Sequence, residues 1–147
     1  MKTYAFFDNS FFTQKPWWLP IKLYNVIYQR SNPRTQEYML ALLSEKFPDA
    51  ELISKGDSYQ MGRIVLLYPD SIGLGWSGLE KEYIKKFKEV NVLNGRKRYF
   101  SLTAVARNKL LLRRILEVTF LPEFIFAPCL LVTGSILAIK DKMAGRS

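Results

Sequence analysis

The sequence predicts a small α/β domain whose sheet and helices form two or three layers, followed by a C-terminal helical segment that associates with a membrane. Strand-like apolar runs and helical patterns follow one another up to residue 103, which is typical of an α/β sheet. Beyond that point the chain becomes basic and then apolar. We therefore expect an α/β domain over residues 1–103, and a basic helix with a membrane-anchoring segment over residues 104–147.

The first half of the chain contains three strand candidates and one clear helix. Tyr4–Phe7 is a short apolar run, and Ala50–Ile53 is a second brief candidate. Between them, Asn32 is suited to cap a helix whose first position is Pro33, and apolar residues then recur at helical spacing. The unbroken run within Arg63–Tyr68 predicts a central strand that is covered on both faces.

The second half predicts a helix followed by a hairpin. Ser77 and Glu80 form a capping-box pattern at the start of an amphipathic stretch. Val90–Leu93 is the next strand, and Asn94–Gly95 predicts a tight turn. Lys97–Leu102 is the expected returning strand.

The residue content excludes several mechanisms. The chain has no histidine, which removes the commonest general base and the commonest zinc ligand. The single cysteine, Cys129, allows neither an intrachain disulfide nor a cysteine-ligated metal site. The formal charge of +9 requires a partner or surface that tolerates cations.

Much of that charge gathers just before the apolar segment, because no acidic residue occurs between Val90 and Leu116. Basic residues beside a membrane segment are attracted to anionic headgroups, and tryptophans favour the same level. A nucleic-acid surface fits less well, since leucines interleave with these charges. For the tryptophans, the alternative is that they cover the domain core. The expected membrane-surface residues are Trp17, Trp18, Arg107, Lys109, Arg113 and Arg114.

The apolar segment, residues 115–139, has an uncharged core from Phe124 to Ile139. As a helix this core reaches only about 24 Å, which is shorter than a hydrocarbon core of roughly 30 Å. With basic residues on both flanks, a re-entrant or interfacial segment is favoured, bent at Pro122–Glu123 or at Pro128. A tilted single span and an apolar helix buried in the domain or against another subunit are the alternatives. Both membrane forms place the domain on the cytoplasmic face of the inner membrane.

The sequence between the central strand and the next helix matches the pattern G-x-G-x-x-G, in which glycines allow a tight turn and close approach of a ligand. This segment resembles the dinucleotide-binding fingerprint of Rossmann-type folds, and the resemblance implies a Rossmann-like domain. The missing carboxylate at the end of the next strand and the bulky Trp76 disfavour a nicotinamide cofactor. The alternative is a turn that serves only to reverse the chain. The expected phosphate-binding residues are Gly73, Gly75, Ser77 and Gly78.

Two aspartates follow strand candidates and are the catalytic candidates of the chain. Asp8 follows the first strand and Asp70 follows the central strand, where α/β proteins tend to place their sites. If the two strands are parallel neighbours, the aspartates would approach each other and suit Mg²⁺, which is the cofactor we consider. For Asp70 the alternative is a role in starting a turn.

These features favour a membrane-associated protein that binds, or supports the handling of, a phosphate-bearing, nucleotide-sugar or lipid-linked substrate. Assembly of bacterial-type envelope polysaccharide or glycolipid is one such setting. The alternative is an accessory or structural subunit of a larger membrane complex, with a membrane-protein partner or a second copy of the chain. An independent enzyme is the third hypothesis, because the acid-base groups are limited to Asp8, Asp70, Glu80 and tyrosines.

Overall fold

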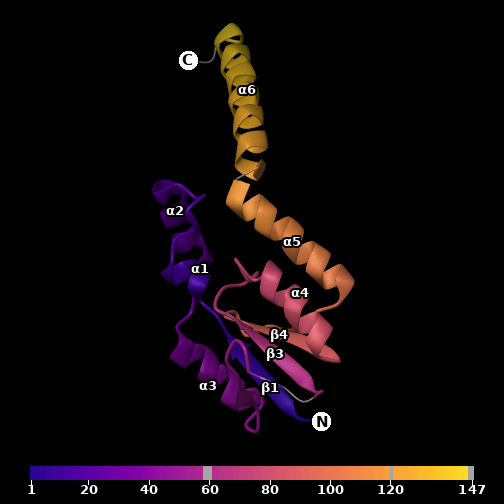
Figure 1. Ribbon diagram of the computed structural model, residues 1–147. Helices are drawn as coiled ribbons and strands as arrows, with labels where there is room; N and C mark the ends of the chain where they lie inside the picture. Colours follow the sequence, from indigo (N-terminus) through magenta and orange to yellow (C-terminus); the bar gives the residue numbers. More distant parts are fainter. Residues whose placement is uncertain (58–60, 120, 146–147) are drawn as a thin grey trace. The chain divides into compact units, whose positions relative to one another are not determined.

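A computed structural model describes residues 1–57, 61–119 and 121–145, with only the backbone described over 121–125 (Figure 1). The chain divides into two compact units, Met1–Arg114 and Ile115–Ser147. The first unit therefore extends beyond residue 103 and takes in most of the basic helix.

The described residues of the first unit form a mixed α/β fold with one five-stranded sheet in the order β2-β1-β3-β4-β5. The strands are β1 (Thr3–Phe7), β2 (Glu51–Leu52), β3 (Arg63–Tyr68), β4 (Glu89–Asn94) and β5 (Tyr99–Ser101). β1 pairs in parallel with β2 on one side and β3 on the other, and β3 pairs in parallel with β4. β5 returns antiparallel to β4. The α/β class and the central position of β3 are confirmed.

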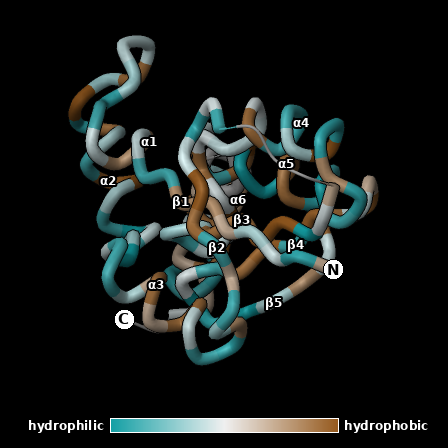
Figure 2. Tube along the Cα trace, turned by 60° about the horizontal axis from the view of Figure 1, so that its bottom comes forward, coloured by the Kyte–Doolittle hydropathy of each residue, from teal (hydrophilic) through white to brown (hydrophobic). Residues whose placement is uncertain are grey.

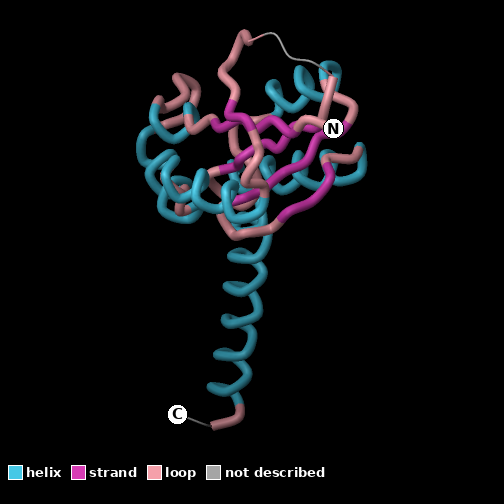
Figure 3. Tube along the Cα trace, turned by 90° about the horizontal axis from the view of Figure 1, so that it is seen from below, coloured by secondary structure: helices cyan, strands magenta, loops and turns pink. Residues whose placement is uncertain are grey.

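Alternate residues of the strands face opposite helical layers, because side chains along a strand point to opposite faces. Helix α3 (Gln36–Lys46) packs Met39 and Leu43 into a buried cluster with Val65 and Leu67 on one face. On the other face, α4 (Ser77–Lys86) and the residues directly before and after it carry rings that contact those of Tyr4 and Phe6. The strands thus lie between helices, in the three-layer form (Figure 3). Figure 2 shows hydrophobic stretches within the sheet.

The segment before α3 differs from the sequence prediction. A helix, α2 (Ile21–Ser31), occupies a stretch whose apolar pattern is ambiguous. Asn32 ends this helix in the left-handed conformation, with φ of 45°, and does not begin the next one. Thr35 caps α3 instead, accepting a hydrogen bond from the Tyr38 N–H. The prediction of Asn32 as an N-cap is wrong because its side chain and backbone suit a left-handed helix end equally well.

The predicted hairpin is confirmed, with a wider loop than two residues. Asn94 accepts hydrogen bonds on its side-chain oxygen from the N–H groups of Arg96 and Arg98. Lys97 takes the left-handed conformation in this loop, with φ of 61°. The chain then enters α5 (Ala104–Thr119).

Helix α6 (Leu121–Met143) belongs to the second unit and continues through Pro128. A reversal of the chain at Pro128 is therefore wrong, since the helix accommodates the proline. The backbone of Pro122 and Glu123 is helical, and their side chains lie outside the described residues. Large apolar side chains along α6 are exposed: Phe126, Leu130, Leu131, Val132, Ile136, Leu137, Ile139 and Met143. Among the helices of the described residues, none combines the length and the apolar character needed to cross a membrane.

Candidate ligand pocket at the switch point of the sheet

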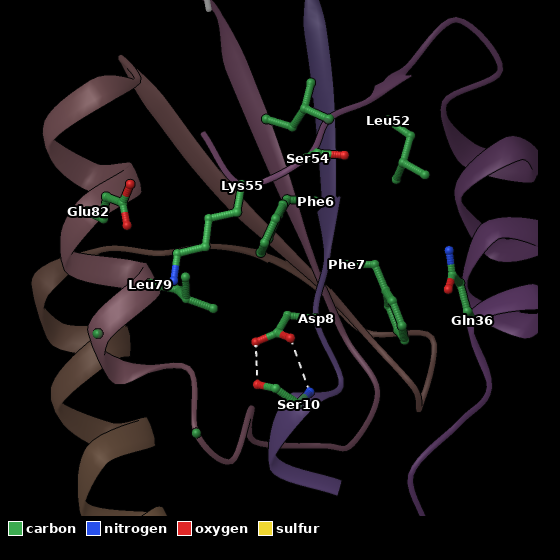
Figure 4. Close-up of a pocket in the computed structure, with 13 residues that line it drawn as sticks. Phe6, Phe7, Asp8, Ser10, Gln36, Leu52, Ser54, Lys55, Leu79 and Glu82 are labelled. Carbon is green, nitrogen blue, oxygen red and sulfur yellow. Dashed lines mark hydrogen bonds between the residues drawn. The ribbon is translucent and has the colours of Figure 1, made fainter. Parts of the chain in front are cut away.

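A pocket of about 710 Å³ lies at the carboxyl ends of β1 and β2 (Figure 4). The chain leaves β1 to reach β2 on one side of the sheet, whereas it leaves β3 to reach β4 on the other. Such a reversal of strand order opens a crevice at the carboxyl edge, where α/β proteins bind ligands. Residues at the starts of α1 (Ser10–Thr13), α3 and α4 also line the pocket.

Asp8 lies on the floor of this pocket, immediately after β1. One carboxylate oxygen accepts a hydrogen bond from the Ser10 N–H at 3.0 Å, and the other accepts one from the Ser10 hydroxyl at 2.8 Å (Figure 4). Each carboxylate oxygen retains a further acceptor position. Asp8 is thus held in a fixed orientation while still able to accept hydrogen bonds from a ligand.

Lys55 supplies a cation to the pocket from the loop after β2. Its side chain crosses the pocket toward α4, and its nitrogen lies near Leu79 in Figure 4. Glu82 also lines the pocket, and its carboxyl group interacts with the charge of Lys55. A hydrogen bond from Lys86, followed by the charges of Lys86 and Lys55, lowers the pKa of the Glu82 carboxyl. The pocket therefore holds two carboxylates and one ammonium group.

Asp70 does not line the pocket but shapes the turn beside it. This turn joins β3 to α4 and contains Gly73 and Gly75, and we call it the glycine turn. The carboxylate of Asp70 is 2% exposed and accepts hydrogen bonds from the N–H groups of Ile72, Gly73 and Leu74 at 3.4, 2.8 and 3.3 Å. Burial raises the pKa of Asp70, and these N–H groups oppose the rise. The turn-forming role of Asp70 is therefore the one that the geometry supports.

The parallel pairing of β1 with β3 meets the condition for Asp8 and Asp70 to approach each other. Their carboxylates are nevertheless engaged with different partners, Asp8 with Ser10 and Asp70 with its own turn. Within the described residues, no group of three or more acidic or cysteine side chains is placed to hold a metal ion. A magnesium site built from both aspartates does not fit this arrangement, and any Mg²⁺ binding would depend on Asp8.

The glycines of the motif have different roles. Gly73, at φ of +69°, lies so close to the Tyr68 ring that a Cβ would come within 2.5 Å of it. Gly75, at φ of +82°, would place a Cβ 2.9 Å from the Cβ of Phe11. Gly78 has open space around it, and together with Gly75 it lines the pocket. Two glycines are thus required by the turn, whereas Gly78 leaves the pocket wall open.

The first turn of α4, which contains Gly78, presents N–H groups that have no acceptor within the helix. Ser77 begins the helix and Trp76 occupies the capping position, where the described structure has no side-chain cap. The first N–H groups of a helix have no partner within it and attract anions. The predicted capping box is wrong, because Glu80 turns into the protein interior instead of back toward Ser77.

Glu80 belongs to a buried cluster that the sequence does not reveal. It accepts hydrogen bonds from Tyr68 and from the guanidinium group of Arg114, whose Nε also donates to the Ile72 carbonyl at 2.8 Å. Arg107 approaches Glu80 from the same helix, at 3.9 Å. Burial and the charge of Glu80 raise the pKa of Tyr68. The cluster joins α5 to α4 and to the beginning of the glycine turn.

The predicted membrane-surface residues separate into two groups. Arg114 is buried and paired with Glu80, so its assignment to a membrane surface is wrong, and Arg107 is half-buried beside it. A basic residue with a buried carboxylate partner cannot be told from an exposed one by spacing alone. The exposed members are Trp17, Trp18, Lys109 and Arg113.

Comparison with protein-family models, with curated proteins and with solved structures gives no match to this chain. Its class therefore rests on its own architecture, an α/β domain with a mostly parallel sheet and a pocket at the switch point.

Proposed function

We propose that the protein binds a small phosphate-bearing molecule in the pocket beside α4, and that residues 115–139 hold it on a membrane. A nucleotide, a nucleotide sugar or a lipid-linked phosphate belongs to this ligand class. The observation that carries the proposal is the pocket of about 710 Å³ at the switch point, next to an uncapped helix start.

The distribution of charge in the pocket suggests how such a ligand would lie. The α4 N-terminus and the Lys55 ammonium group are the two sources of positive potential, and they favour the phosphate. Gln36 lies on the α3 side of the pocket and Asp8 lies beside Ser10 in Figure 4, and both can accept hydrogen bonds from hydroxyl groups. A ligand with a phosphate at one end and a sugar at the other matches both regions.

Gly78 offers a direct test, because a larger side chain would enter the pocket without disturbing the fold. Calorimetric titration with uridine diphosphate glucose should show saturable binding to the unchanged protein. In Gly78→Leu we expect affinity to fall at least about tenfold, which corresponds to about 1.4 kcal/mol. Gly134→Leu is the matched control, since Gly134 is also helical and surrounded by open space. Absence of binding, or equal binding by Gly78→Leu, would remove the proposal.

The membrane part of the proposal is supported by the exposed apolar side chains of α6. Leu130 and Leu131 are 72% and 73% exposed, and exposed apolar surface of this kind is normally covered by lipid or by another protein. Basic residues follow the segment as well as precede it.

An accessory subunit of a membrane complex is the second candidate, favoured by the same exposed surface of α6. Native mass spectrometry in mild detergent separates the two functions. A stable protein partner would favour the subunit, whereas a monomer that retains a small phosphate-bearing ligand would favour the binding protein.

A further inference from the structure

A second exposed apolar surface lies on the first unit, around the start of α2. We call Trp17, Trp18, Ile21 and Tyr28 the N-terminal aromatic surface, since Ile21 and Tyr28 share one face of α2. Their exposed fractions are 93%, 53%, 63% and 44%. Trp17 and Ile21 thus present large apolar areas to solvent although the unit has a well-formed core elsewhere.

The exposure of the tryptophans follows from how their loop is held. The Lys15 ammonium group donates to the carbonyl oxygens of Pro16 and Leu19, at 3.1 and 2.7 Å. Leu19 is 2% exposed and fixes the end of the loop in the core. With the loop closed by Lys15 and anchored by Leu19, the two tryptophans between these contacts remain outside.

The charge around this surface has one sign. Residues 9–36 contain no acidic side chain, and their basic residues are Lys15, Lys22, Arg30 and Arg34. A protein partner would have to present an acidic patch of matching shape, whereas a bilayer with anionic lipids offers negative charge over any area. Indole rings also favour the headgroup level, where one edge is apolar and the other is hydrated.

We propose that the N-terminal aromatic surface is a second membrane-binding site, which inserts Trp17 and Trp18 at the headgroup level of a bilayer containing anionic lipids. This inference rests on the membrane association proposed above. It adds a contact made by the α/β unit itself, through residues other than 115–139. Membrane binding would then involve the domain directly and not its C-terminal segment alone.

Tryptophan fluorescence tests the contact directly. The chain has three tryptophans, and the third, Trp76, is 1% exposed, so changes in emission report on Trp17 and Trp18. The full chain is mixed with vesicles of phosphatidylcholine alone or with phosphatidylglycerol. With the anionic vesicles we expect emission to shift to shorter wavelength and to be quenched by brominated lipids. Flotation of the vesicles measures binding in the same samples.

Two variants assign the contact to this surface. Lys22→Gln should weaken binding to anionic vesicles about fivefold, the effect expected for one charge near the surface. Trp17→Ala/Trp18→Ala should reduce flotation with anionic vesicles, while Met61→Ala, a control at a residue of 75% exposure, should leave it unchanged.

The outcomes separate this inference from the membrane association on which it rests. If the protein floats with vesicles but its emission does not change, the second site is overturned and residues 115–139 remain the sole proposed contact. If the protein does not float with either kind of vesicle, membrane association fails and the second site fails with it. A shift of equal size with neutral vesicles would overturn the proposed preference for anionic lipid.

Discussion

At the scale of single residues, Arg114 connects the stability of the fold to the shape of the pocket. Its guanidinium group pairs with the fully buried Glu80 and also donates to the Ile72 carbonyl, at the start of the glycine turn. Removing one member of a buried pair leaves the other charge without compensation, which costs more than the intact pair contributes.

Replacement of Arg114 should therefore affect stability far more than replacement of its neighbour. We expect Arg114→Ala to lower the free energy of unfolding by about 3–5 kcal/mol, because Glu80 stays fully buried and loses its hydrogen-bonded cation, while Arg107 approaches it only to 3.9 Å. Arg113→Ala changes an exposed arginine and should alter it by less than about 0.5 kcal/mol. Urea unfolding measures both. Equal effects of the two variants on the free energy of unfolding would contradict the buried ion pair. The double variant Glu80→Leu/Arg114→Met should recover most of the stability that Arg114→Ala loses.

Asp70 should give the fold a measurable dependence on pH. Burial raises its pKa in the folded state above the ordinary value of 3.8, so the folded protein binds the proton more tightly than the unfolded chain. The contribution of Asp70 to stability is then largest below that value and falls as pH rises through the raised pKa. The difference in unfolding free energy between the unchanged protein and Asp70→Asn should decrease with rising pH in this window. A difference that is constant or increases would argue against the raised pKa.

At the scale of elements, the turn between β3 and α4 combines residues that shape the chain with one that borders the pocket. Gly73→Ala should destabilise the fold by at least about 1–2 kcal/mol, since alanine is strained at positive φ and its Cβ would displace the Tyr68 ring. Gly78→Ala lies in a helix with open space and should stabilise the protein by roughly 0.5–1 kcal/mol. Thermal unfolding compares the two. Similar losses in both variants would contradict the separate roles of these glycines.

Most elements of the first unit are predictable from the sequence because their apolar patterns are strong. The run in β3 and the spacing of Tyr83 and Phe87 identify buried faces without reference to other elements. The partner of Glu80 is not predictable, since Arg114 is 34 residues away and joins it only through the packing of α5. Lys55 was missed for a similar reason. Lys55 follows β2, which has only two residues. Such a short strand gives too weak a sequence pattern to show that the loop after it borders a site.

At the scale of the whole chain, a folded α/β unit and a helix with exposed apolar side chains form two units with different requirements. The first unit has its own core, whereas large apolar side chains of α6 are exposed. Leu131→Glu introduces a charge at a residue of α6 that is 73% exposed. We expect this variant to leave the membrane fraction after carbonate washing more readily than the unchanged protein, because a carboxylate at depth costs a few kcal/mol. Asp57→Asn is a control in the other unit. Equal retention would contradict lipid contact at Leu131.

The shape and charge of the pocket at the switch point predict binding of a phosphate-bearing ligand. Titration of ¹⁵N-labelled full chain in detergent with uridine diphosphate glucose, followed by amide chemical shifts, tests it most directly. We predict saturable shifts at the N–H groups of Ser77, Gly78 and Leu79 and at Lys55, with little change at the α6 amides. No saturable shift at these positions, or shifts confined to residues outside the pocket, would contradict the claim.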